Sequence, residues 1–165
     1  MARSRLKDGR LQRIKVTAIK GEHCVVTALF VCDHLSIKTP QRFIVDTGSV
    51  HTTVPETKAR EMGVNLETLD KYKVKMRMGG IGGAADARML GNVRLIFAAT
   101  DNSSIEEKLQ SVVVLRDPVV CSEEERNILQ TFPCILGLDV IRRFTLRFEE
   151  KNFAYLERET AITGS

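Results

Sequence analysis

One aspartate stands in a sequence context that suits acid–base chemistry. Asp46 follows the apolar run Phe43–Val45 and precedes Thr47, Gly48 and Ser49. An aspartate between an apolar strand and Thr-Gly is predicted to lie on a sharp turn, because glycine permits backbone conformations closed to other residues. The two hydroxyls can hold a carboxylate in position, and the apolar run would help to desolvate it. The candidate catalytic residues are Asp46, Thr47, Gly48 and Ser49.

A second motif follows about 90 residues later. Ile135-Leu-Gly137 places two apolar residues and a glycine ahead of a helix predicted over Leu138–Phe144. Neither motif is specific alone, because an isolated Asp-Thr-Gly also occurs in ordinary turns. Their order and spacing make the combination informative.

Between the two motifs, the glycine-rich segment Gly79–Gly83 predicts the tip of a β-hairpin. Polar and apolar residues alternate before it over Tyr72–Met78, and the second strand follows over Ala84–Leu90. A plain surface hairpin and a phosphate-binding loop are the alternatives. The phosphate loop is disfavoured, because the segment lacks the Lys-Ser/Thr of such loops and no helix follows it.

With these motifs in this order, the sequence resembles the retropepsin-like aspartic proteases, and it is more similar to their prokaryotic and shuttle-protein branches than to the viral enzymes. The family pattern is apolar-apolar-Asp-Thr/Ser-Gly-Ala/Ser, a flap hairpin, and Ile/Leu-Leu/Ile-Gly before a short helix. The match runs from about Leu11 to Glu157. It implies an aspartic endopeptidase whose flap closes over a bound peptide. The flap residues implied to contact the substrate are Met78, Gly79, Gly80, Ile81, Gly82 and Gly83.

The chain departs from the retroviral pattern at two positions. Retroviral enzymes usually carry an acid two residues after the motif glycine and an arginine directly after the second glycine, and these two form an ion pair. Val50 and Leu138 occupy those places here. Because both charged partners are absent together, neither is left unpaired.

The implied chemistry requires a second copy of the chain. Metal-free peptide hydrolysis of this kind needs one carboxylate to deprotonate water and one carboxylic acid to polarise the carbonyl. Two carboxyls about 3 Å apart cannot both ionise, so they share a proton. The sequence holds no second Asp-Thr/Ser-Gly, so the other carboxyl must be Asp46 of a second copy, placed by a twofold axis. The terminal strands Arg13–Ile19 or Phe153–Glu157 are the expected interface.

The predicted fold class is mostly β: a retropepsin-like acid protease fold, closed and β-barrel-like, with a flap hairpin and short helices, and an active site completed by homodimerisation. The 165 residues are enough for one such domain. We expect a basic N-terminal tail over 1–10, the protease domain over 11–158 and a C-terminal tail over 159–165.

Turn residues and hydrophobic periodicity predict the remaining strands and helices. We expect Pro40 to end a loop, Pro55 to open a helix and Gly63 to close it. Further strands and helices are predicted over 23–33, 42–46, 56–62, 93–98, 111–115 and 145–148, and a helix is predicted to start at Ser122.

Charge is concentrated at the N-terminus. The chain has 25 Lys and Arg against 21 Asp and Glu, and seven of the basic residues but only one acid fall within residues 1–20. Such a tail could bind nucleic acid or an anionic membrane, but a solvated terminus is the simpler interpretation. We expect no nucleic acid and no membrane as partners. The expected partners are a second copy of the chain and a peptide or protein substrate.

No cofactor or metal is expected. A zinc site could be drawn from His23, Cys24, Cys32 and His34, but these residues lie in or beside a strand-like run where cysteine behaves as a small buried hydrophobe. The cysteines show no disulfide framework, so a reducing, cytoplasmic location is expected. A catalytically silent module of the same fold, serving dimerisation or peptide binding, remains the alternative function.

Overall fold

The computed structural model describes residues 10–19, 23–71, 75–80, 83–117, 122–124, 127, 131–150 and 153–160. The strands are β1 (Arg10–Ile19), β2 (His23–Cys32), β3 (Ile37–Val45), β4 (Thr53–Pro55), β5 (Lys75–Gly80), β6 (Gly83–Ala98), β7 (Ser104–Leu115), β8 (Cys134–Leu136), β9 (Thr145–Glu150) and β10 (Phe153–Thr160). The helices are the 3-10 helix η1 (Asp33–Leu35), α1 (Glu56–Glu61), α2 (Leu66–Lys71) and α4 (Leu138–Ile141). The chain is mostly β with short helices, as predicted.

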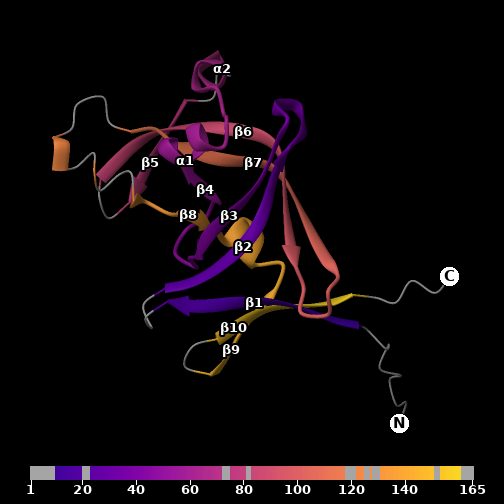
Figure 1. The fold of residues 1–165 in the computed structure, drawn as a ribbon. Helices are drawn as coiled ribbons and strands as arrows, with labels where there is room; N and C mark the ends of the chain where they lie inside the picture. The colour runs from indigo at the N-terminus through magenta and orange to yellow at the C-terminus, as the bar shows by residue number, and fades with distance from the viewer. Residues whose placement is uncertain are drawn as a thin grey trace, which may run out of the picture.

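The strands form one sheet that closes on itself in part. Its order is β5-β6-β7-β4-β8-β3-β2-β1-β10-β9, and β6 also pairs with β2. The extra pairing joins β2, β3, β8, β4, β7 and β6 into a closed ring, which agrees with the barrel-like expectation. In Figure 1, β1, β10 and β9 lie together at the bottom of the view and α2 lies at the top, while α1 lies beside β7 of the ring.

Strand β7 shows how sequence pattern follows burial. Its first half alternates exposed and buried residues, because one face meets the core and the other meets solvent. Its second half, Val112–Val114, is fully buried on both faces, as the unbroken apolar run predicts.

The same strand carries Glu107, only 3% exposed, which accepts hydrogen bonds from Arg143 after α4 and from Arg158 on β10. These ion pairs tie the end of α4 to the sheet.

The terminal strands pair within the chain. Strand β1 runs antiparallel to β10 along most of its length, and β10 pairs with β9. The long β6–β7 hairpin reaches this layer, where Thr100 N donates to Arg13 O at 2.8 Å. Strand β9 is therefore the end of the sheet on this side within the part of the chain that the structure describes.

Several local expectations were wrong. Pro40 lies inside β3, paired with Leu29, rather than in a loop. The strand tolerates it because β8 joins the other side of β3 only from Phe43 onward, which leaves Pro40 beside an unpaired edge. The two strands expected around Asn92 form the single strand β6, with Asn92 at φ 55°. Helix α2 was not predicted.

Other expectations were confirmed or concern residues that the structure does not describe. Helix α1 begins after Pro55, and Gly63 follows it with φ +90°, the left-handed conformation that favours glycine. The final hairpin is confirmed as β9–β10. The turn at Gly21 and most of the helix expected from Ser122 lie outside the described residues. Among the described residues, no helix is long and apolar enough to cross a membrane.

Candidate active site

The two sequence motifs lie side by side. Strand β3, which leads to Asp46, pairs in parallel with β8, which leads to Gly137. Asp46 N donates to Leu136 O at 3.1 Å, so the aspartate is held at the end of this pair. Because parallel strands end at the same edge of a sheet, residues about 90 positions apart meet at one place.

The carboxylate of Asp46 is fixed by its own turn. Gly48 N donates to Asp46 Oδ1 at 2.8 Å, and Ser49 Oγ donates to Asp46 Oδ2 at 2.9 Å. Ser49 N also donates to the Asp46 carbonyl at 3.2 Å. A Cβ at Gly48 would lie 3.1 Å from Asp46 Oδ1, so glycine leaves the approach to that oxygen open. The half-buried carboxylate therefore has both oxygens engaged, while one edge still meets solvent.

Thr47 and Val50 complete the outer surface of the turn. Thr47 is exposed, and no hydrogen bond joins its side chain to another described residue. Val50, in the place of the retroviral acid, is 62% exposed. Both side chains are open to a further molecule beside Asp46.

Backbone contacts hold this turn against the second motif. Leu138 N donates to Ser49 O at 2.8 Å, and Asp139 N donates to Val50 O at 3.1 Å. Gly137 packs so closely that a Cβ there would lie 2.4 Å from the carbonyl carbon of His51. Glycine is therefore needed at 137 because the His51 backbone leaves no room for a side chain. Its backbone conformation does not require glycine, since a φ of −95° is open to any residue.

Thr52 and Asp139 form a link that sequence reasoning missed. Asp139 Oδ2 accepts from Thr52 N at 2.9 Å, and Asp139 Oδ1 accepts from Thr52 Oγ1 at 2.7 Å. Thr52 is fully buried, and its hydroxyl oxygen also accepts from Gly137 N at 3.2 Å. The only sequence signal was an aspartate in the first turn of the predicted helix.

The predicted flap is present as the hairpin of β5 and β6. Gly79 pairs with Ala84, and Gly80 pairs with Gly83, so the register brings the glycines to the tip. Met78 lies on β5 opposite Ala85. Ile81 and Gly82 lie outside the described residues. The hairpin is confirmed as a structural element, while contact with a substrate stays a prediction.

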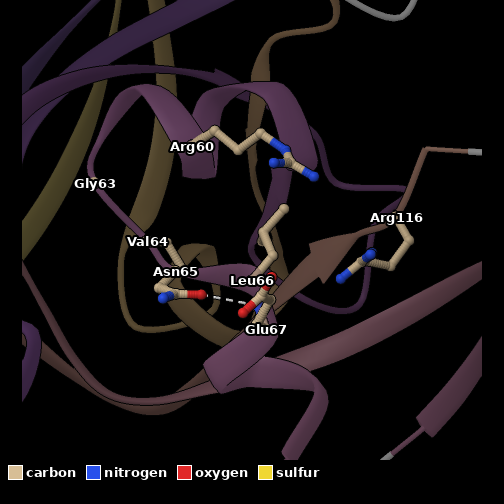
Figure 2. A pocket seen from close by; sticks show the side chains of 7 residues that line it. All are labelled: Arg60, Gly63, Val64, Asn65, Leu66, Glu67 and Arg116. Carbon is tan, nitrogen blue, oxygen red and sulfur yellow. Dashed lines mark hydrogen bonds between the residues drawn. The ribbon is translucent and has the colours of Figure 1, made fainter.

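The hollows on the described surface include one of about 500 Å³ beside α1 and α2, and Figure 2 shows the side chains that line it. Arg60 and Arg116 point toward this hollow, but both are bound to the buried Glu56, at 2.6 Å and 2.9 Å. Their charge is therefore largely compensated. Another hollow, of about 590 Å³, lies along β3 and is lined there by residues 40–44.

The cysteine and histidine pairs do not form a metal centre. Cys32 Sγ lies 3.4 Å from His34 Nδ1, whereas His23 and Cys24 stand at the opposite end of β2. No group of three or more His, Cys, Asp or Glu among the described residues is placed to hold a metal ion. Burial raises the pKa of Cys134 to about 12, and burial also raises the pKa of Cys32. Both thiols are inert side chains of the core.

Comparison with solved structures identifies the fold. The crystal structure of a retropepsin-like aspartic protease from Rickettsia conorii aligns with a TM-score of 0.52 and 16% identity, covering 93% of this chain and 97% of that one. EIAV protease complexed with the inhibitor HBY-793 aligns with a TM-score of 0.41 and 13% identity, covering 73% and 86%. No family model and no curated protein matches the sequence. The chain therefore has a retropepsin-like fold, as its motifs predicted, and at this identity the likeness extends to the fold alone.

Proposed function

We propose that the protein is an aspartic endopeptidase that acts as a homodimer, with Asp46 of each copy at the twofold axis. One observation carries the proposal: in a retropepsin-like fold, the Asp46 carboxylate is held by Gly48 N–H and Ser49 O–H at the end of β3. A carboxylate fixed by its own turn, with one edge open, is pre-organised for proton transfer.

The reaction follows from a shared proton. The ionised carboxyl of the pair accepts a proton from water as the oxygen attacks the peptide carbonyl. The protonated carboxyl donates its proton to the carbonyl oxygen, which gives a neutral tetrahedral intermediate. Collapse of that intermediate breaks the C–N bond: the protonated carboxyl donates its proton to the leaving amine, and the ionised carboxyl accepts a proton from one hydroxyl of the intermediate, which becomes the carboxylic acid product. The pair therefore ends with one proton, as it began. No charge is created or lost, so the pair is ready for another cycle.

An incompletely covered apolar row supports the second copy. Val16 on β1 pairs with Ala154 on β10, which pairs with Phe148 on β9. Val16 and Ala154 are at most 1% exposed, whereas Phe148 is 68% exposed. Because directly paired residues share one face of the sheet, Phe148 continues the core row past the point where the core ends. A second copy packed against β9 would cover it and pair its free edge.

The interface expected from the sequence, at the terminal strands, stays a prediction. Strands β1 and β10 pair with each other within the chain, and β1 pairs with β2 on its other side only over Thr17–Ile19. Strand β9 offers a further edge at the end of the sheet that the structure describes. Thr47, exposed beside Asp46, would face the turn of the second copy.

Cleavage of a denatured protein such as casein tests the proposal. Wild type is expected to cleave it, and Asp46→Asn is expected to lose at least about 100-fold in rate, since acid–base groups contribute factors of that size. Asp33→Asn makes the same chemical change at a surface carboxylate whose side chain is 74% exposed, and it should leave the rate unchanged.

Mixing tests whether the site is shared. If each site needs Asp46 from both copies, a fixed amount of wild type should lose activity as folded Asp46→Asn is added and subunits exchange. A monomeric enzyme would keep its activity in the mixture, and that result would contradict the dimer. Peptide binding with no cleavage would instead favour the catalytically silent module.

A further inference from the structure

The hollow of about 590 Å³ along β3 combines apolar lining with the guanidinium of Arg42, which has no ion-pair partner among the described residues. It lies between β2, β3, α1 and the segment that leads into β8. Its lining residues are His23, Val25, Pro40, Gln41, Arg42, Phe43, Ile44, Lys58, Thr131, Phe132, Pro133 and Cys134. We call this hollow the β3 groove.

Strand register places one end of the groove beside Asp46. Val25 on β2 pairs with Ile44 on β3, and both line the groove. The pairing of β2 with β3 ends at this pair, and Asp46 follows Ile44 by two residues, which is about 7 Å along an extended chain. This end of the groove therefore lies close to the candidate active site.

The other end of the groove carries Arg42. It pairs with Thr27 and lies on the same face as Ile44. Arg42 precedes Asp46 by four residues, which corresponds to about 13 Å along an extended strand. A peptide bound in the groove with its reacting bond at Asp46 would reach Arg42 with a side chain three or four residues away.

Every charged group that lines the groove is basic. Lys58 is bound to Glu61 at 2.8 Å, so its charge is partly compensated. Arg42 and His23 are exposed, and neither forms an ion pair or hydrogen bond through its side chain with a described residue. Phe132, 46% exposed, adds an uncovered ring. A ligand that matches this lining has a carboxylate near Arg42 and an apolar side chain near Phe132.

We propose that the β3 groove binds an acidic segment of the protein substrate, with a Glu or Asp side chain at Arg42 and an apolar residue against Phe132. This inference rests on the proposed protease function and names a substrate preference for the same site. The arginine acts at a distance from the reacting bond, so it sets specificity rather than chemistry. A polypeptide fits the concave, largely apolar groove better than a nucleic acid, whose phosphates would leave Phe132 and the two prolines uncovered.

Matched peptides test the preference. Cleavage of a mixed peptide library by wild type first gives the bonds that are cut. Pairs of peptides are then made that differ only in Glu or Gln at three, four or five residues from the bond. For one of these positions, we expect kcat/KM to be about two- to five-fold higher with Glu, the range for partly exposed ion pairs. Raising the salt from 50 to 500 mM should shrink the preference.

Two variants test whether the Glu preference comes from Arg42 in the groove or from the overall positive charge of the protein. Arg42→Gln should remove the Glu preference by lowering kcat/KM for the Glu peptides toward that for the Gln peptides. Lys108→Gln removes the same charge from β7, where the side chain is 80% exposed and lies outside the groove, and should keep the preference. Equal cleavage of the Glu and Gln peptides by wild type, or a preference that survives Arg42→Gln, would overturn the inference.

Binding distinguishes this inference from the proposed function. Fluorescence anisotropy with labelled Glu and Gln peptides is measured on folded Asp46→Asn, which should bind the Glu peptide more tightly by a similar factor. If wild type cleaves nothing, apolar peptides that differ in one central Glu or Gln replace the library-derived pairs; a Glu preference in binding that depends on Arg42 then leaves the groove proposal standing while the protease proposal fails. If neither peptide binds, or a single-stranded oligonucleotide binds more tightly than both, the groove proposal fails.

Discussion

Substitution of Gly137 by alanine should push the segment after β8 away from the His51–Thr52 backbone that follows the Asp46 turn. An added Cβ would lie 2.4 Å and 2.6 Å from the carbonyl carbon and oxygen of His51, and 2.8 Å from Thr52 N. Ordinary contacts begin near 3.4 Å, so the two backbones must part by about 1 Å. All three atoms are backbone, so no side-chain rotation can relieve the contact.

The loss of stability and of activity can be estimated from these contacts. Overpacking of this kind costs about 1–3 kcal/mol. Two hydrogen bonds across the contact would also weaken, Gly137 N to Thr52 Oγ1 and Leu138 N to Ser49 O, at about 1 kcal/mol each. The free energy of unfolding should fall by about 3 kcal/mol, which lowers Tm by roughly 6–12 °C in a domain of this size. Cleavage should fall by about 100-fold, since 1 Å of misplacement has that effect at reacting groups.

Gly91→Ala is the matched control. Its added Cβ would meet only Gln110 O, at 3.6 Å, which is an ordinary contact. Unfolding followed by circular dichroism, together with casein cleavage, should show this variant within about 1 kcal/mol of wild type. If Gly137→Ala melts within about 2 °C of Gly91→Ala and cleaves equally well, the close packing of the second motif does not hold the site.

Three further predictions concern the interface, the dyad and the core. Phe148→Lys should convert the dimer to monomers in sedimentation and abolish cleavage, because a charge cannot be buried unpaired against β9; a dimer that persists would place the interface elsewhere. Ser49→Ala should lower the rate of casein cleavage, because the Ser49 hydroxyl donates to Asp46 Oδ2 and helps to fix the carboxylate. Cleavage at the wild-type rate would show that Ser49 does not position Asp46. In a Cys121→Ser background, iodoacetamide at pH 8 should modify Cys24 and spare Cys32 and Cys134, whose raised pKa values keep them neutral there; equal labelling in intact-mass spectra would contradict their burial.

The sequence predicted the elements whose patterns are local. Alternation identified β1 and the β5–β6 hairpin, and the unbroken apolar run Val112–Val114 identified a strand buried on both faces. Pro55 and Gly63 marked the ends of α1 within a residue or two. In each case the side chains that decide the structure lie within a few residues of one another, so the pattern is visible in the chain itself.

What the sequence could not predict depends on partners distant in the chain. Pro40 looked like a loop residue because its tolerance in β3 depends on where β8 begins to pair. Asp139 looked like a helix residue because its bonds go to Thr52, 87 residues away. The free edge at β9 arises only after β1 and β10 have paired with each other. None of these relations leaves a local signal.

The hydrogen bonds around Asp46 explain why a single chain would hold only half a site. On its inner side, the turn is fixed by β8, by Gly137 and by the buried Thr52, so the carboxylate has little freedom to move. On its outer side, Thr47 and Val50 are exposed. Under the proposed function, the second carboxylate comes from another copy of the chain, since the sequence holds one Asp-Thr-Gly motif. Two identical aspartates can share a proton only if each is held firmly within its own subunit and is exposed toward the other.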